Sequence, residues 1–175
     1  MIEIPSRTQL FNPRSTGVAV ELGVCEGRFS EEILKGSSFD VVYSIDRWAG
    51  EGGPDKADKY HGEEQYRRVV EKLSVFGRRS MIIRASFSEA VKTFDDGYFD
   101  FIYIDGYAHN GQEEGQTLWQ WWPTLKSGGL FCGHDYDKQM FPKTVKAVDE
   151  FFASLGLEMG LTTRDQYASW YTWKP

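Results

Sequence analysis

Short apolar runs alternate with amphipathic segments along most of this 175-residue chain. Compact runs rich in Val, Ile, Leu and Phe predict buried strands, and a 3.6-residue apolar period between them predicts helices. The predicted strands comprise residues 18–22, 41–46, 81–85, 99–105 and 130–135. The predicted helices comprise residues 28–35, 66–73, 88–94, 113–125 and 145–155. This alternation indicates a parallel sheet with helices on both faces.

Two further β-prone runs end the chain, at residues 157–163 and 167–173. The link between them is too short for a crossover, so they form an antiparallel pair. The expected fold class is α/β, a doubly wound, mostly parallel sheet with a C-terminal antiparallel hairpin. Gly36 and Gly156 are expected to stop the helices that precede them. The length of the chain fits a single domain, residues 1–175.

Two segments have no period of their own. Residues 1–16 contain two prolines and predict an extended lead-in that packs over an edge of the sheet. Residues 49–61 are rich in Gly, Pro and Asp, and they are too many for a simple connection. We expect this second segment to be a lid or substrate loop that orders when the site fills.

Composition narrows the choice of partners. A net charge of −6 argues against nucleic acid and anionic membranes, and favours a small-molecule or glycan acceptor. The sequence contains no long apolar run and no basic-then-apolar leader, so we expect a cytoplasmic protein. Cys25 and Cys132 lie in or beside predicted strands and are expected to be buried, reduced thiols, with a disulfide or metal pair as the lesser alternative.

The stretch from Gly17 to Gly27 combines a strand, a glycine turn and the start of a helix, with the pattern E-x-G-x-x-x-G. The spacing is not the G-x-G-x-x-G of a dinucleotide site, and the Gly-Lys-Ser/Thr of a Walker loop is absent. A helix N-terminus favours an anion, but Glu21 would repel one and pair with a cation. A turn without any ligand remains the alternative for this pattern taken alone.

Polar residues stand at the ends of all five parallel strands: Glu21, Asp46, Ser86, Asp105 and Asp135. Functional groups of such sheets cluster at the carboxyl ends of the strands. Any one of these residues could simply cap a helix, but their joint occurrence favours a site.

Several motifs in order resemble the class I methyltransferases that use S-adenosylmethionine, in particular the sugar and antibiotic O-methyltransferases. They are E-x-G-x-x-x-G, IDRW, S-x-E-A, FDFIYIDG, WWPTLKSGGLFCGHDY and VKAVDEFF, and they span residues 17–156. The resemblance implies a seven-stranded sheet and S-adenosylmethionine as the methyl donor. It does not imply a particular acceptor.

The resemblance also implies roles for residues of the donor site. Glu21 and Gly23 would hold the methionine end, Gly27 would allow close approach, and Ser30 would bond the donor's carboxylate. Asp46 would accept both ribose hydroxyls, and Trp48 would stack on adenine or simply pack in the core. Ser86 would meet the adenine edge, although Ala85 stands where the family usually has an acid. Asp105 would also lie beside the donor.

For the acceptor, the resemblance implies a divalent metal such as magnesium held by Asp105 and Asp135, with His134 where a second acid often stands. The family places a histidine in D-G-x-H, whereas this chain has D-G-Y-A-H, so His109 matches if the loop bulges. The resulting hypothesis is that Asp105 and the metal position a hydroxyl and His109 removes its proton.

Three classes of function remain open at this point. The first is O-methylation of a sugar or other small molecule. The second is a non-catalytic domain that binds S-adenosylmethionine or a partner, and the third is a nucleotide-dependent oxidoreductase with an aberrant fingerprint. Glu21 and the terminal hairpin disfavour the third class. Because little chain is left to cover the acceptor, either the acceptor is large or a second subunit of a homo-oligomer closes the site.

Overall fold

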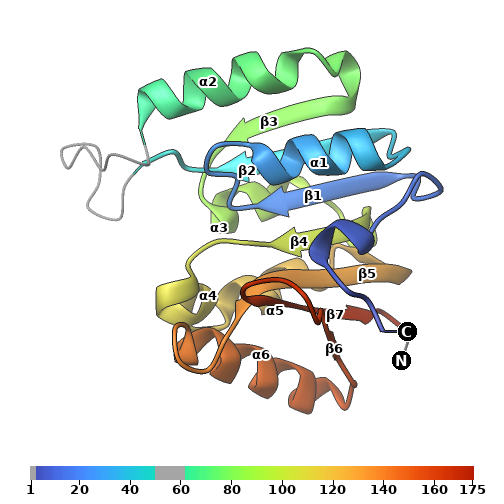
Figure 1. The fold of residues 1–175 in the computed structure, drawn as a ribbon, viewed down its shortest axis with the longest axis vertical. Coiled ribbons are helices and arrows are strands. Elements are labelled where there is room, and N and C mark those ends of the chain that lie inside the picture. Colours follow the sequence, from blue (N-terminus) through green and yellow to red (C-terminus); the bar gives the residue numbers. More distant parts are fainter. Residues whose placement is uncertain (1–2, 50–61) are drawn as a thin grey trace.

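A seven-stranded sheet runs through the centre of the molecule (Figure 1). The computed structural model describes residues 3–49 and 62–175. The strands are β1 (Val18–Leu22), β2 (Val41–Asp46), β3 (Ser80–Arg84), β4 (Phe99–Ile104), β5 (Leu125–Tyr136), β6 (Gly160–Leu161) and β7 (Ala168–Trp173). Their order across the sheet is β3-β2-β1-β4-β5-β7-β6. Strands β1 to β5 are parallel, and β7 pairs antiparallel with both β5 and β6, which confirms the predicted fold class.

Helices cover both faces of this sheet. They are α1 (Arg28–Gly36), α2 (Glu63–Ser74), α3 (Phe87–Ala90), α4 (Gly111–Glu114), α5 (Gln116–Trp121) and α6 (Pro142–Leu155). Four short 3₁₀ turns are also described: η1 (Arg7–Gln9), η2 (Gly77–Arg79), η3 (Val91–Thr93) and η4 (Ala108–Asn110). One core cluster joins α1 and α2 to the sheet, and the other joins α3, α5 and α6 to the opposite face. The sheet is therefore doubly wound.

The apolar periods of the sequence explain how these helices dock. Phe29, Ile33 and Leu34 form the buried face of α1, and Val69 and Leu73 form that of α2. The strands between the helices are apolar on both sides because both of their faces are covered. Val70 of α2 is 37% exposed although it is apolar, so the buried face of this helix is narrower than its apolar residues suggest.

The lead-in covers a face of the sheet and not an edge, which corrects the prediction for residues 1–16. Ile4, Leu10 and Phe11 are buried in the same cluster as α1 and residues of β4, β5 and β7. The backbone carbonyl of Pro5 accepts hydrogen bonds from residues 163 and 164 of the terminal hairpin, at 3.1 and 2.8 Å. In the described chain, α1 and α2 do not extend over β5 and β7 on this face of the sheet (Figure 1). The lead-in covers these strands in place of a helix.

The helix predicted over residues 113–125 is wrong in part. Residues 111–115 all have positive φ and form a left-handed turn, α5 then ends at Trp121, and Leu125 already begins β5. The helix propensities of these residues do not indicate a left-handed backbone. Pro123 ends the helix earlier than the apolar spacing suggests. Smaller shifts occur elsewhere: β3 begins one residue before residue 81, and the helix predicted at 88–94 is α3 followed by η3.

The two glycines expected to stop helices behave differently. Gly156 follows α6 with φ 64°, the left-handed conformation in which glycine costs least. Gly36 is still helical, and α1 ends at Ser37, which is extended. Its lack of a side chain serves packing, because a Cβ there would lie 2.8 Å from the Phe11 ring.

The two cysteines also differ. Both are free thiols, and Cys132 is buried as predicted. Cys25 is exposed, because it belongs to the turn after β1 and not to the strand. Among the described helices, none is long and apolar enough to cross a membrane.

Candidate active site

The loops that follow the parallel strands surround a cavity of about 330 Å³ at one edge of the sheet. The strands point to the left in Figure 1, so this edge lies on the left of that view. The lining includes Gly23 after β1, Asp46 and Arg47 after β2, Asp105 to His109 after β4, and Asp135 at the end of β5. The predicted strand-end residues thus meet at one cavity, except Glu21 and Ser86. The candidate lid, residues 49–61, lies outside the described residues apart from Ala49, which lines this cavity.

Gly23 is required where the β1 and β4 loops touch. Its φ is +92°, and a Cβ at this position would lie 2.3 Å from the carbonyl oxygen of Asp105. Only glycine combines this backbone with so close an approach. Gly27 has φ +71° at the start of α1, and a Cβ there would lie 3.2 Å from Val69 of α2. The structure therefore explains both glycines by their backbones and neighbours, before any donor is considered.

Asp46 organises the glycine turn from the end of β2. One oxygen, Oδ2, accepts hydrogen bonds from the backbone N–H groups of Val24 at 2.9 Å and Cys25 at 3.0 Å. The other, Oδ1, accepts one from the N–H of Trp48 at 2.9 Å. A carboxylate offers about four acceptor positions. The predicted contacts with both ribose hydroxyls would therefore need Asp46 to share or release some of these bonds.

Glu21 is buried beneath the turn, with 1% of its surface exposed. The hydroxyl of Ser30 donates to Glu21 Oε2 and lies 2.7 Å from the Ser44 hydroxyl. Burial raises the pKa of Glu21 well above its ordinary value; the Ser30 hydroxyl lowers it in part, and the charge of Asp105 raises it further. Ser30 is itself fully buried. In this structure it holds Glu21 and does not reach out to a donor carboxylate, contrary to the prediction.

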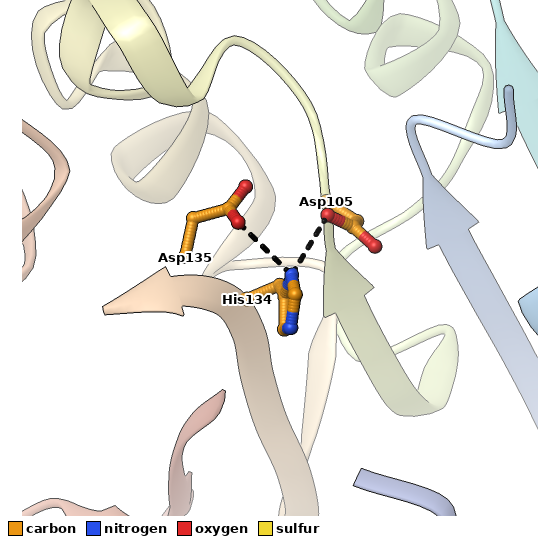
Figure 2. A group of neighbouring side chains, drawn as sticks. All are labelled: Asp105, His134 and Asp135. Carbon is orange, nitrogen blue, oxygen red and sulfur yellow. Dashed lines mark ion pairs between the residues drawn. The ribbon is translucent and has the colours of Figure 1, made fainter. Parts of the chain in front are cut away.

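Asp105, His134 and Asp135 come together at the ends of β4 and β5 (Figure 2). Each offers one ligand atom, and these atoms all lie within 4.8 Å of one another. His134 Nδ1 lies 3.0 Å from Asp135 Oδ1 and 3.5 Å from Asp105 Oδ1. These are the three residues that the resemblance implied for a metal. All three side chains are largely buried, with 14–21% of their surface exposed.

A bulge in β5 makes this cluster possible. Successive side chains of a regular strand point to opposite faces, so His134 and Asp135 could not both approach Asp105. The register between β5 and β7 shifts between Gly133 and Tyr136, and Asp135 has a left-handed backbone with φ 61°. Bulges of this kind re-aim side chains near functional sites.

The imidazole of His134 carries positive charge into this group of acids. Burial lowers its pKa, but hydrogen bonds and attraction to Asp105 and Asp135 outweigh this effect and raise the pKa to about 9. Without a metal, an imidazolium therefore lies between the two carboxylates. A donor set of two carboxylates and one imidazole also suits a divalent cation.

His109 lies in η4 and lines the same cavity as Asp105 and Asp135. The loop accommodates its extra residue through Tyr107, whose φ is 58° and whose carbonyl accepts from the N–H of Asn110 at 3.2 Å. The His109 ring lies 5.2 Å from the ring of Phe141. The longer D-G-Y-A-H loop thus still brings its histidine to the cavity.

Two predicted contacts to adenine do not fit the arrangement. Trp48 is fully buried, packs against Tyr66 at 5.0 Å between ring centroids, and donates from Nε1 to the Cys25 carbonyl at 3.0 Å. It has no exposed face on which a base could stack, so core packing is its role here. Ser86 caps α3 in a reciprocal capping box with Glu89. Ser86 therefore caps a helix, which is the alternative stated above for each strand-end residue.

Strained backbone gathers around the same edge. Among the described residues, every non-glycine residue with positive φ follows β1, β2 or β4 or lies at the end of β5: Cys25, Trp48, Tyr107, Gln112, Glu113, Glu114 and Asp135. Left-handed non-glycine residues cost about 1–2 kcal/mol each. Such strain is typical of sites whose geometry serves function.

Sequence reasoning missed Arg7, which reaches the site from the lead-in. Its Nη1 lies 3.4 Å from Asp105 Oδ2. Arg7 and Asp105 are 98 residues apart, and the segment around Arg7 has no period, so no local signal could have revealed the pair. Arg47 and Phe141 also line the cavity and were not predicted.

Comparison with known proteins identifies the family. A family model described as a methyltransferase domain matches residues 20–136, which is more than half of the chain. The chain belongs to this methyltransferase family. The matched region begins in β1 and ends with β5, so it contains every strand end that contributes to the cavity. The class I, S-adenosylmethionine-dependent fold implied by the sequence motifs is thereby confirmed.

Individual relatives are distant. The chain is 28% identical over 120 residues to an uncharacterized protein, y4gI, of Sinorhizobium fredii; the match covers 66% of this chain but only 13% of that protein. The O-methyltransferase NovP superposes with a TM-score of 0.66 and 22% identity, covering 90% of this chain and 72% of NovP. SMU.1697c of Streptococcus mutans, solved in complex with SAH, has a TM-score of 0.66 at 14% identity and covers 96% and 93% of the two chains. At these identities the solved structures establish the fold.

Proposed function

We propose that this protein transfers a methyl group from S-adenosylmethionine to a hydroxyl of a sugar or another small molecule. The observation that carries the proposal is the cluster of Asp105, His134 and Asp135. It borders the cavity that also contains the glycine turn and Asp46. Donor-binding and acceptor-activating groups would then share one cavity, as methyl transfer requires.

The cluster would hold a divalent cation such as magnesium. Two carboxylates and an imidazole within 4.8 Å of one another provide a donor set of the right kind and spacing. A bound cation would lower the pKa of the acceptor hydroxyl and orient it. His134 would then exchange its proton for the cation, because a ligating imidazole is neutral.

His109 would remove the hydroxyl proton as the donor's methyl is transferred. Methyl transfer to oxygen is an in-line displacement, and a hydroxyl is a poor nucleophile while it keeps its proton. His109 is exposed and lines the cavity next to Asp105, so its imidazole is accessible to an acceptor. General bases of this kind contribute about 10²–10⁴-fold to the rate.

The walls of the cavity support a small acceptor with a flat face. Phe87, Tyr107 and Phe141 all line it, and the rings of Phe87 and Tyr107 pack edge to face with their centroids 5.0 Å apart. Aromatic rings bind the apolar faces of sugars and of phenols. The net charge of −6 disfavours a polyanionic acceptor such as a nucleic acid.

A methyl-transfer screen tests this function. Purified protein is incubated with labelled S-adenosylmethionine and a panel of sugars, glycans and phenols, with magnesium, with EDTA, and with EDTA followed by excess magnesium. We expect product with at least one hydroxyl acceptor, loss of activity in EDTA and recovery on adding metal. Full activity in EDTA would refute the metal, and donor binding without transfer to any acceptor would favour a non-catalytic binding domain.

A matched pair of variants ties the effect to the cluster. Asp135→Asn keeps the size of the side chain and tolerates the left-handed backbone, but removes the charge. Asp137→Asn is the control: Asp137 Oδ1 accepts from the N–H groups of Gln139 and Met140, and an asparagine oxygen can do the same. We expect Asp135→Asn to abolish metal-dependent turnover and Asp137→Asn to retain it.

A further inference from the structure

A second cavity, of about 280 Å³, adjoins the glycine turn on the side of α1. It shares Gly23, Cys25 and Asp105 with the main cavity. Its remaining walls include Arg7 from the lead-in, Glu21 from β1 and Phe29 from α1. The two cavities therefore meet at the contact between the β1 and β4 loops. A single elongated ligand that lies across this contact would reach both.

Arg7 is held in place on one wall of this second cavity. Its guanidinium lies 4.6 Å above the centre of the Phe29 ring, and its Nη1 lies 3.4 Å from Asp105 Oδ2. The backbone N–H of Arg7 donates to Asp165 Oδ2 at 2.8 Å, which ties the lead-in to the terminal hairpin. Its side chain remains 29% exposed. The guanidinium also bonds Tyr103, but with five N–H donors it can bind a further acceptor.

The cavity carries charges of both signs. Burial lowers the pKa of Arg7, but interactions with Tyr103 and Asp105 outweigh this effect and raise it, so the side chain is always a cation. Glu21 and Asp105 supply carboxylates on the neighbouring walls. A ligand group that matches such a lining must itself be zwitterionic, with a carboxylate and an ammonium a few ångströms apart. The α-amino acid end of S-adenosylmethionine is such a group.

We propose that Arg7 binds the α-carboxylate of the methyl donor, while Glu21 and Asp105 receive its α-ammonium group. The lead-in is then a wall of the donor site, in addition to its role in covering the sheet. The guanidinium also takes the carboxylate contact that Ser30 does not provide, because Ser30 is buried against Glu21. This inference rests on the proposed function, since it takes S-adenosylmethionine as the donor.

Two ligands that differ only in the amino acid end test the role of Arg7. S-adenosylhomocysteine carries the α-carboxylate and α-ammonium groups, whereas 5′-methylthioadenosine has the same nucleoside and thioether without them. Binding of each is measured by isothermal titration to the wild type and to Arg7→Met. Methionine keeps an apolar stem over Phe29 but has no charge. Arg14→Met is the control, because Arg14 is an exposed arginine of the same lead-in.

Arg7→Met should weaken S-adenosylhomocysteine by about 10–100-fold, the range expected for a charged hydrogen bond. It should change the affinity for 5′-methylthioadenosine by less than about twofold, and Arg7→Lys should recover part of the lost affinity. Arg14→Met should behave as the wild type with both ligands. Unchanged binding of S-adenosylhomocysteine by Arg7→Met would overturn the proposal. An equal loss for both ligands would also overturn it, because Arg7 would then act only by shaping the pocket.

The same titrations separate this inference from the proposed function. If the wild type binds neither ligand, the assignment of the donor fails, and the proposal for Arg7 fails with it. If the wild type binds both and Arg7→Met behaves the same, only the proposal for Arg7 fails. Thermal unfolding of each variant, followed by circular dichroism, shows whether a loss of binding has a folding cause.

Discussion

The acids on the two halves of the candidate site are held in opposite ways. On the β1–β2 side, Glu21 is covered and accepts from Ser30, and Asp46 accepts three backbone N–H groups. On the β4–β5 side, Asp105 and Asp135 face each other across His134 and line the open cavity. The first pair is satisfied by the protein itself. The second gathers negative charge around one titratable cation.

This difference indicates separate roles for the two halves, one in forming the donor site and the other in binding a metal. A carboxylate that accepts several backbone N–H groups fixes the loop that surrounds it, so the glycine turn is formed before any ligand arrives. Carboxylates that converge on one imidazole leave a position that a metal can take over. We therefore expect substitutions on the β1–β2 side to affect donor binding and stability together. Substitutions of Asp135 and His109 on the β4–β5 side should affect turnover alone, whereas Asp105 also lines the second cavity, so its substitution should affect donor binding as well.

The largest effect is expected for His109→Ala. If His109 is the general base, kcat should fall by about 10²–10⁴-fold, while the affinity for S-adenosylhomocysteine stays within about twofold. Steady-state kinetics at saturating donor and isothermal titration measure the two quantities. Loss of donor affinity would contradict the division, because it would make His109 part of the donor pocket.

Asp46→Asn should have the next largest effect, on the donor side. An amide can accept at one oxygen only, so at least one of the N–H groups of Val24, Cys25 and Trp48 loses its partner. We expect the affinity for S-adenosylhomocysteine to fall by about 10–100-fold, with a lower Tm. Asp95→Asn, at an exposed acid, is the control. A variant with unchanged Tm and weakened binding would show that Asp46 serves the ligand and not the loop.

Glu21→Gln should sharpen the comparison through its pH dependence. Burial raises the pKa of Glu21 in the folded protein. A raised pKa means that the residue's contribution to stability is full below the pKa of the unfolded chain and is lost as the pH rises through the folded value. Without ligand, the variant should therefore have a higher free energy of unfolding and a higher Tm than the wild type at pH 8. The difference should vanish near pH 4.

Thermal unfolding across this pH range measures the effect. Glu32→Gln, at an exposed acid of helix α1, is the control and should show no such trend. A Glu21→Gln variant that is less stable than the wild type at pH 8 would mean that the buried carboxylate stabilises the fold. Our expectation that the buried charge of Glu21 destabilises the folded protein at this pH would then be wrong.

The smallest effect on binding is expected for Ser86→Ala. Loss of the capping box of α3 should cost about 1 kcal/mol of stability and lower Tm by about 2–4 °C. The affinity for S-adenosylhomocysteine should stay within about twofold. A tenfold loss of affinity without a change in Tm would restore Ser86 to the donor site.

The sequence alone determined the order of the strands and helices, the antiparallel end of the sheet and the motifs of the family. These features follow from local periodicity, from short links and from glycines whose spacing is fixed along the chain. Because parallel strands end at a common edge, the sequence also predicted that Asp105 and Asp135 would lie near each other, and the resemblance to the family added His134. Residues 113–125 differ from the prediction because left-handed backbone overrode the local pattern. Trp48 is buried, so it takes the core-packing role that had been left open, and Ser30 is buried against Glu21.

Only the tertiary structure decided how the strand-end groups are used. The bulge at the end of β5 turns His134 and Asp135 toward the same point, although neighbours on a strand normally diverge. The lead-in brings Arg7 to Asp105 across 98 residues of chain. Backbone N–H groups of the glycine turn occupy Asp46. These three features depend on contacts between segments far apart in sequence or on a rare backbone conformation. Such contacts and conformations produce no periodic pattern of apolar residues, so the sequence does not reveal them.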